Sequence, residues 1–357
     1  NIASGGSITN NGTYTKVPGG VVKFAGTGTI SGTIDFTNVT LAGSVNFGAG
    51  STIYGILTIN ANGAVNTNAP KYATGSKLLY DLSNATYPRG LEWSSSLVGE
   101  AGYPYTVELK TSVTLNVGAT STPSQCVGDL IVGSGCTFSM DESGSAMTAP
   151  VTVSSVTNEG AIKLSSLSGG DLKLSGDITK NTGSITSTKG AVIFIAEADQ
   201  TITSTSAIPY ISINKSAGKV SLLSALTCNG AAAGGNALET KTATSILDLA
   251  GYALTIGKAG EASTYNSGIS NPGFINADYG PISILGTGNF GTLLFDQTSD
   301  GTTNNLTNLT IDRASNGKVS IGNALNVTNL TITNGILEIQ PTSSVTATAV
   351  TNNSGVG

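Results

Sequence analysis

The chain has 357 residues, a formal net charge of −5, only 10% charged residues, no histidine and 47 glycines. It lacks both a basic stripe and an apolar run of about 18 residues, so neither a nucleic-acid partner nor a membrane-spanning helix is expected. The absence of histidine also excludes catalytic triads and histidine-based acid–base catalysis. Its richness in threonine, asparagine, serine and glycine favours an extracellular protein.

Short alternating segments fill the N-terminal part of the chain. VVKFAG (21–26) and ILTINANG (56–63) are typical, because apolar residues alternate with polar ones and the run ends at glycine or Asn-Gly. Such alternation places every second side chain inside, as in β-strands. Asn62-Gly63 and Asn334-Gly335 predict turns that need positive φ. No segment predicts a helix, so we expect an all-β fold.

Residues 66–109 differ from the rest, since they hold the only tryptophan, five tyrosines and three prolines. We interpret this stretch as a loop-rich insertion. One interpretation is that the aromatic residues cover the side of a lengthened coil. The other is a carbohydrate platform, whose candidate glycan contacts are Tyr87, Trp93, Tyr103 and Tyr105.

Three cysteines follow further along the chain. Cys126 and Cys136 flank one strand and one turn, and we predict a disulfide between them, with Gly133 and Gly135 folding the chain back. Cys228 shares an apolar face with Leu226, which predicts a free, buried thiol. Because there is no CxxC pair and no histidine, we expect no metal site and no cofactor.

An internal repeat decides the predicted architecture. ISINKSAGKVSLLSAL (211–226) aligns with LTIDRASNGKVSIGNAL (309–325), and the repeat units extend over about 190–230 and 291–335. Repeats of short strands and Gly/Asn turns indicate an elongated parallel β-helix, or β-solenoid. We expect a single continuous array over 1–357 with irregular loop insertions, including a loop at 257–273. The alternative is a set of antiparallel sandwiches of about 98 residues each.

The alternation also predicts which side chains fill the core of this β-helix. The predicted core residues are Leu57, Ile59, Ile211, Ile213, Val220, Leu309, Ile311, Val319, Leu330 and Ile332.

Carboxylates are dispersed, which argues against an enzyme. A polysaccharide-active β-helix enzyme needs clustered acids, often with a basic residue or Ca²⁺. The closest approaches to a cluster are Asp141-Glu142 and the pair Asp296 and Asp300. The second pair lies in the repeat, where its counterparts are Glu197 and Asp199. Solvated turn acids explain these pairs, and calcium binding in the repeat turns is the open alternative.

Outward threonines raise the question of an ice-binding face. Residues of this kind near the C-terminal end are Thr307, Thr310, Thr328, Thr331 and Thr333. Their spacing varies along the chain, and outward threonine is ordinary on strands, so we do not expect such a face.

Two long stretches carry a family resemblance: GSTIYGILTINANGAVNTNAPKYATGSKLLYDLSNATYPRGLEW (50–93) and GTLLFDQTSDGTTNNLTNLTIDRASNGKVSIGNALNVTNLTITNGILEI (291–339). They resemble the repetitive surface proteins of Bacteroidota, which are adhesin-like substrates of the type 9 secretion system. The resemblance implies a β-helical cell-surface protein and brings no catalytic residues with it. Such chains usually end in a sorting domain, so we expect this sequence to be part of a longer one.

These observations together predict a non-catalytic, secreted structural or adhesin-like protein of the cell surface. Its expected partners are other surface or secretion-system proteins, extracellular glycans, or further copies of itself in an oligomer or filament. An exposed solenoid end offers unpaired backbone groups for such assembly. The alternative function is that of a polysaccharide lyase or glycoside hydrolase.

Overall fold

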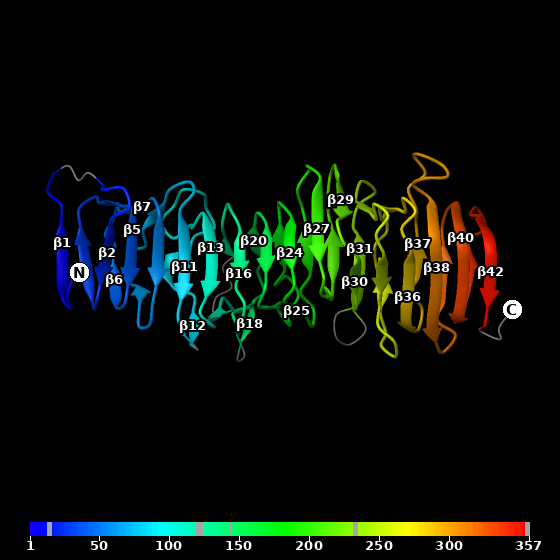
Figure 1. Ribbon diagram of the computed structural model, residues 1–357, viewed down its shortest axis with the longest axis horizontal. Helices are drawn as coiled ribbons and strands as arrows, with labels where there is room; N and C mark the ends of the chain where they lie inside the picture. Colours follow the sequence, from blue (N-terminus) through cyan, green and yellow to red (C-terminus); the bar gives the residue numbers. More distant parts are fainter. Residues whose placement is uncertain (13–15, 84, 119–123, 143–144, 231–234, 354–357) are drawn as a thin grey trace. The chain divides into compact units, whose positions relative to one another are not determined.

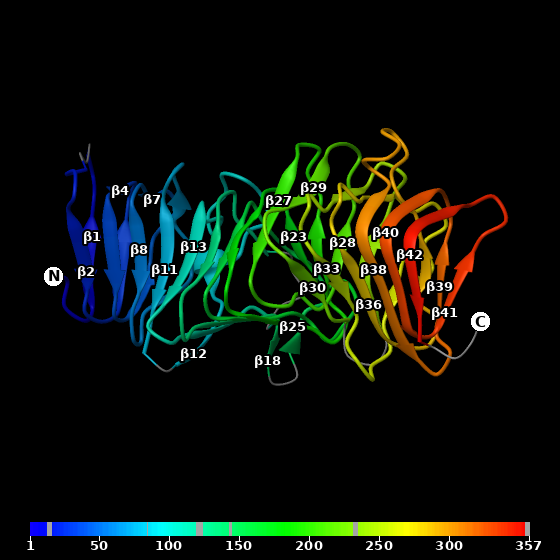
Figure 2. The ribbon, with the colours of Figure 1, turned by 45° about the vertical axis from the view of Figure 1, so that its right-hand side comes forward.

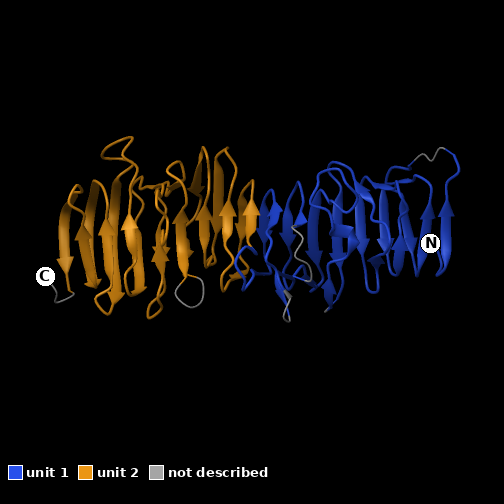
Figure 3. Ribbon diagram, turned by 180° about the vertical axis from the view of Figure 1, so that it is seen from behind, with its two compact units in different colours: residues 1–170 blue, residues 171–357 orange. Residues whose placement is uncertain are grey.

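The computed structural model describes residues 1–12, 16–83, 85–118, 124–142, 145–230 and 235–353. The chain forms two compact units, Asn1–Gly170 and Asp171–Gly357 (Figure 3). Within each unit, short strands of successive coils lie side by side (Figure 1). The strand pairings of the described residues are parallel, apart from the β18–β19 hairpin. The fold is therefore a parallel β-helix, as predicted, and antiparallel sandwiches are ruled out; one continuous array over 1–357 stays a prediction.

Unit 1 winds around one long sheet and several shorter ones. The long sheet contains, in order, β2 (Val21–Phe24), β5 (Asn38–Leu41), β8 (Ile56–Ile59), β11 (Lys77–Asp81), β13 (Thr106–Lys110), β16 (Leu130–Val132) and β21 (Val156–Asn158). The shorter sheets are formed by β1 (Gly6–Thr9), β3 (Gly28–Ser31), β6 (Ser44–Asn46) and β9 (Ala64–Val65); by β4 (Asp35–Phe36), β7 (Thr52–Ile53) and β10 (Lys71–Tyr72); by β12 (Thr86–Pro88), β14 (Thr114–Asn116), β17 (Thr137–Ser139) and β22 (Ala161–Lys163); by β15 (Ser124–Gln125) and β20 (Val151–Val153); and by β18 (Asp141–Glu142) and β19 (Ser145–Ala146).

The described residues of unit 2 form four stacks of strands, and Figure 2 shows β36, β38, β40 and β42, which belong to the longest of these stacks, side by side. The stacks are β24 (Ile178–Asn181), β27 (Gln200–Ser204), β29 (Lys219–Leu222), β32 (Ile246–Asp248) and β35 (Phe274–Asn276); β23 (Leu172–Leu174), β26 (Val192–Phe194), β28 (Ile211–Ile213), β31 (Asn236–Thr240) and β34 (Thr264–Tyr265); β30 (Leu226–Cys228), β33 (Leu254–Ile256), β36 (Ile282–Thr287), β38 (Asn305–Ala314), β40 (Leu325–Asn334) and β42 (Val345–Asn352); and β37 (Gly291–Leu293), β39 (Lys318–Ile321) and β41 (Ile336–Ile339). The unit also contains β25 (Ser184–Thr186).

The hydrophobic core follows the predicted alternation. Nine of the ten predicted core residues are buried, and they come from both units. The exception, Ile332, is half-buried near the end of β40. It lies close to β41 and β42, whose side chains are largely exposed, so fewer apolar neighbours cover it.

The predicted Asn-Gly turns are confirmed. Asn62 adopts a φ of 66°, and Gly335 adopts a φ of 96°. At Gly63 the requirement is steric, since a Cβ there would lie 2.3 Å from the main-chain oxygen of Leu41 on the preceding coil. The glycine therefore allows two coils to approach each other at the corner.

The predicted insertion at 66–109 is only partly irregular. It includes β10, β11, β12, the 3₁₀ turn η1 (Leu91–Trp93) and the start of β13, and β11 pairs with both β8 and β13. The irregular part lies between η1 and β13, at residues 94–105. Similarly, the predicted loop at 257–273 contains β34.

The internal repeat corresponds to a strand–turn–strand motif, β28–β29 in one copy and β38–β39 in the other. Lys215, two residues after β28, and Arg313, near the end of β38, are equivalent in the alignment, and both are buried. Lys215 Nζ donates to the main-chain oxygens of Ala196 and Ala198, at 2.5 and 2.7 Å. Arg313 likewise donates to main-chain oxygens, which are those of Ser263, Leu285, Thr287 and Gly288. In both copies the cation thus binds backbone that precedes the motif in the chain.

The second strand of each copy bonds to an acid on the coil that follows it, whereas the buried cation binds backbone that precedes the motif. In β29, Lys219 Nζ and Ser221 Oγ both donate to Oδ2 of Asp248, at 2.6 and 3.0 Å. In β39, Lys318 Nζ and Ser320 Oγ donate to the two carboxylate oxygens of Glu338, at 3.0 and 2.7 Å. Each acid lies on the next strand of the sheet, directly opposite the serine in the strand register. The repeated Gly-Lys-Val-Ser sequence therefore ties its coil to the one that follows.

Candidate functional site

The four aromatic residues predicted as glycan contacts do not form a surface platform. Trp93 and Tyr103 are buried, and Tyr87 and Tyr105 are half-buried. The Trp93 indole donates to the main-chain oxygen of Gln125 at 2.8 Å, and its ring lies 6.2 Å from that of Phe138. The prediction was wrong for Trp93 and Tyr103, because the segment folds these large rings onto the coils instead of presenting them to solvent.

Two of these aromatics do line a small cavity in unit 1. The cavity measures about 170 Å³ and is lined by Tyr72, Thr74, Val98, Gly99, Tyr103, Tyr105 and Val127. Pockets that enclose small molecules usually measure about 300–1,000 Å³. This cavity is too small for a saccharide to occupy as the protein stands.

Behind it lies a buried acid that the sequence analysis did not single out. Glu92 is fully buried, and its Oε1 accepts hydrogen bonds from the Tyr80 hydroxyl at 3.0 Å and from the Gly90 amide at 2.8 Å. Burial raises the pKa of Glu92, although these hydrogen bonds oppose the effect. Tyr72 donates to the main-chain oxygen of Glu92 at 2.9 Å. Since no solvent reaches the carboxyl group, it organises the segment around η1 and cannot serve as a catalytic acid for a polymer.

The predicted disulfide between Cys126 and Cys136 is absent, because all three cysteines are free and buried. Cys126 directly follows β15 and Cys136 directly precedes β17, with β16 between them, and these strands belong to three different sheets. The turn at Gly133–Gly135 leads the chain on into β17 and does not fold it back towards Cys126. The prediction of a free, buried Cys228 is confirmed.

The paired acids of the repeat turns bond to their own surroundings. Asp296 accepts from the backbone and hydroxyl of Thr298, at 3.1 and 2.7 Å, and Asp300 accepts from Asn304 at 2.8 Å. In the other copy, Glu197 accepts from Ser216 and Asp199 from the Lys219 amide. In the part of the chain that the structure describes, no three acids and cysteines are grouped closely enough to hold a metal ion.

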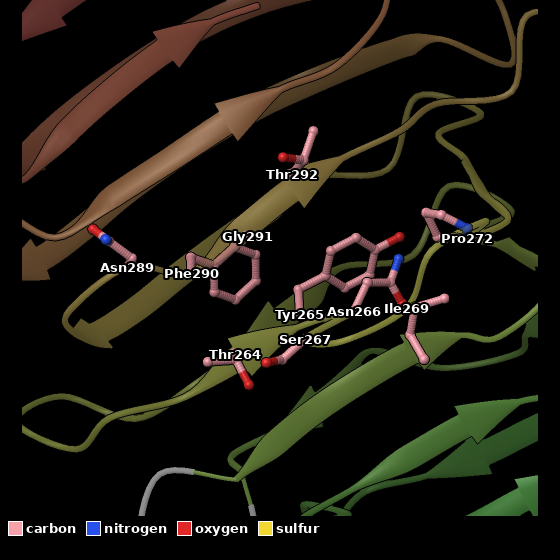
Figure 4. A pocket seen from close by; sticks show the side chains of 10 residues that line it. All are labelled: Thr264, Tyr265, Asn266, Ser267, Ile269, Pro272, Asn289, Phe290, Gly291 and Thr292. Carbon is pink, nitrogen blue, oxygen red and sulfur yellow. The ribbon is translucent and has the colours of Figure 1, made fainter.

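A larger pocket of about 350 Å³ lies in unit 2 (Figure 4). Its floor and walls come from β34, from the loop that follows it, and from the start of β37. The lining residues are Thr264, Tyr265, Asn266, Ser267, Ile269, Pro272, Asn289, Phe290, Gly291 and Thr292. None of them carries a carboxylate or a basic group.

The local backbone explains how this pocket is held open. The Tyr265 amide bonds to the main-chain oxygen of Phe290 at 2.8 Å, which joins β34 to the start of β37. Gly291 has a φ of 127°, and a Cβ there would lie 2.3 Å from the main-chain oxygen of Tyr265. Asn266 adopts a φ of 52° and anchors the loop through two bonds to Thr240, at 2.7 and 3.0 Å. Burial raises the pKa of Tyr265 to about 12, so its hydroxyl stays neutral.

A second surface feature of unit 2 is a column of hydroxyl groups along the sheet from β30 to β42. Strand register aligns Thr227, Thr255, Ser283, Thr310, Thr331 and Thr351. These side chains are half-buried or exposed, and those from Thr227 to Thr310 stand between buried apolar neighbours. Of the five outward threonines named in the sequence, Thr310 and Thr331 belong to this column, which aligns hydroxyl residues although their spacing in the sequence varies.

Comparison of the chain with known protein families, with curated proteins and with solved structures found no match. In the described part of the chain, no helix has the length and apolarity that crossing a membrane would need.

Proposed function

We propose that this chain is a non-catalytic, secreted structural or adhesin-like protein of a cell surface. The observation that carries the proposal is the use of its ionisable side chains. Lys215, Arg313 and Glu92 are buried and bond to the fold itself, and Asp248 and Glu338 are each held by a lysine and a serine of the neighbouring strand. The 350 Å³ pocket is lined by uncharged side chains, which suits binding without chemistry.

The proposal keeps the affiliation that the sequence suggests, namely the adhesin-like type 9 secretion substrates of Bacteroidota. Its partners are then extracellular glycans or other surface and secretion-system proteins, and copies of the chain itself are candidates for an oligomer or filament. The parallel β-helix supports this role because a stack of coils presents long, regular faces to a partner.

The competing function is that of a polysaccharide lyase or glycoside hydrolase. Both glycosidase mechanisms need two carboxyl groups that flank the scissile bond within about 5–9.5 Å. The decisive experiment incubates the purified chain with a panel of acidic and neutral polysaccharides, measures released reducing ends and unsaturated products, and measures retention of the same polysaccharides in a binding assay. We expect binding without product. Sustained turnover that scales with protein concentration would refute the proposal.

A further inference from the structure

The unit 2 pocket combines apolar walls with polar groups that have no role in the fold. Tyr265 and Phe290 stack almost in parallel, with ring centroids 5.9 Å apart and an interplanar angle of 13°, and Ile269 and Pro272 extend the apolar lining. Figure 4 shows Thr292 on the strand above the two rings. Such a mixture of apolar surface and a few placed polar groups is typical of small-molecule sites.

Three of the polar lining groups are available to a ligand. Ser267 Oγ, Thr292 Oγ1 and the side-chain amide nitrogen of Asn289 have no hydrogen-bond partner among the described residues, while Asn289 Oδ1 accepts from the Lys318 amide at 3.3 Å. The other polar groups are already engaged, as when Thr264 Oγ1 donates to Asn236 at 2.7 Å. The pocket thus offers two hydroxyls and an amide N–H₂ held on a fixed frame.

The side chains that line the pocket offer no charge to a ligand. Two cations lie close to the lining residues. Lys318, whose main chain bonds to Asn289 and Phe290, pairs its ammonium group with Glu338 at 3.0 Å. Arg313 has its guanidinium 5.2 Å from the centre of the Phe290 ring. Its nitrogens donate to main-chain oxygens and to the Ser263 hydroxyl, so none of them is directed to an anion in the pocket. With no carboxylate in the lining either, neither an anionic nor a cationic ligand would find a counter-charge.

We propose that this pocket binds a neutral saccharide, one or two sugar units of a longer glycan. A pyranose ring has an apolar C–H face for the half-buried Ile269–Pro272 side, and hydroxyls that match the free groups of Ser267, Asn289 and Thr292. The stacked rings of Tyr265 and Phe290 are buried and form the rigid floor beneath this site. The volume of about 350 Å³ lies at the lower end of the range for ligand pockets, which limits the enclosed part to a short segment. This inference rests on the proposed adhesin-like function and names the ligand class for one of its sites.

The test measures binding of a panel of sugars to the whole chain by ligand-observed NMR and calorimetry. The panel contains the methyl glycosides of glucose, galactose, mannose and N-acetylglucosamine, together with glucuronic and galacturonic acid. We expect at least one neutral sugar to bind and the uronic acids to bind more weakly than their neutral counterparts. Thr292→Val should weaken binding about two- to tenfold, the effect of one lost hydrogen bond. Ser267→Trp, at an exposed position, should block the pocket and abolish measurable binding.

The matched control is Thr255→Val, which removes an outward hydroxyl of the same unit that is not part of the pocket lining and should leave affinity unchanged. Unfolding curves of all three variants establish that each is folded. The inference is overturned if no neutral sugar binds, if the uronic acids bind best, or if the two pocket variants bind as the wild type does. In the last case the chain still binds glycans elsewhere and the proposed function stands, whereas cleavage of the polysaccharide panel would remove the proposed function itself.

Discussion

Replacing Arg313 tests whether the buried cations of the repeat hold neighbouring coils together. Arg313→Met keeps an unbranched chain of similar length but removes every donor of the guanidinium. Main-chain oxygens at the end of β36, at 285, 287 and 288, and that of Ser263 then lose their partners inside the fold. Met brings no polar group that could replace the guanidinium, so this end of the strand must open to water or leave its oxygens unsatisfied.

The expected cost follows from the number of bonds. A hydrogen bond from a charged donor contributes about 1.5–3 kcal/mol net, so four such bonds correspond to roughly 6–12 kcal/mol. Burial of the cation opposes this, since desolvation lowers the pKa of Arg313 from 12.5 to about 10 and so offsets part of the gain. Water that reaches the freed main-chain oxygens recovers a further part. We therefore expect Arg313→Met to lower the free energy of unfolding by about 3–5 kcal/mol, in the upper range for a single substitution.

The assay is hydrogen exchange measured by mass spectrometry, because a long stack of coils need not unfold in one step. Peptides that cover 282–293 should lose protection in the variant, while those from unit 1 should not. Arg313→Lys, with three donors, should cost less. Lys318→Met is the matched control, since it removes a half-exposed cation of the same motif and should cost about 1 kcal/mol or less. Equal effects of Arg313→Met and Lys318→Met would refute the argument.

Three further predictions concern unit 1 and the thiols. The raised pKa of Glu92 means that the folded state binds its proton more tightly than the unfolded state, so the contribution of this group to stability is fully present below about pH 4.3 and is lost as pH rises towards the folded pKa. In denaturant titrations over pH, Glu92→Gln should remove this part of the pH dependence, and an unchanged profile would contradict the argument. Mass spectrometry of the unreduced protein after alkylation in denaturant should find three thiols. Alkylation of the native protein should be slow, because burial raises the pKa of Cys228 to about 12 and also raises the pKa of Cys126. A disulfide-linked peptide that contains Cys126 would show that the chain path is wrong. Gly63→Ala should destabilise unit 1 by about 2 kcal/mol or more in urea unfolding, because the added Cβ would clash with the main-chain oxygen of Leu41. A variant as stable as the wild type would show that the two coils separate easily.

Alternation was enough to predict the strands and most of the core, because in a parallel β-helix each short strand buries one face whatever its neighbours are. Leu57 and Ile59 are buried for this reason. Ile332 departs from the pattern because its exposure depends on the strands beside it and not on its own segment. Local sequence predicts which way a side chain points, but not how much of the molecule covers it.

The sites could not be predicted in the same way, since they depend on register between coils. Successive hydroxyl residues of the column from Thr227 to Thr351 are 28, 28, 27, 21 and 20 residues apart, and they align only because the turns absorb the differences in coil length. The pocket is similarly formed by Tyr265 and Thr292, which lie on neighbouring coils. The cysteine prediction failed on the same point, because the turn after β16 turns a corner of the coil where we had expected a hairpin.

The two copies of the internal repeat align in sequence but occupy different positions in the coils. The alignment of 211–226 with 309–325 is visible in the sequence, and a repeated unit would ordinarily occupy the same place in successive coils. Instead, β28 and β29 belong to different sheets from β38 and β39. What is repeated is therefore a pattern of bonding: Lys215 or Arg313 binds the backbone before the motif, and a Lys-Val-Ser strand binds an acid on the coil after it. In both places the motif joins its own coil to the coils before and after it, so several of the few charged residues, 10% of the chain, act inside the coils or between them.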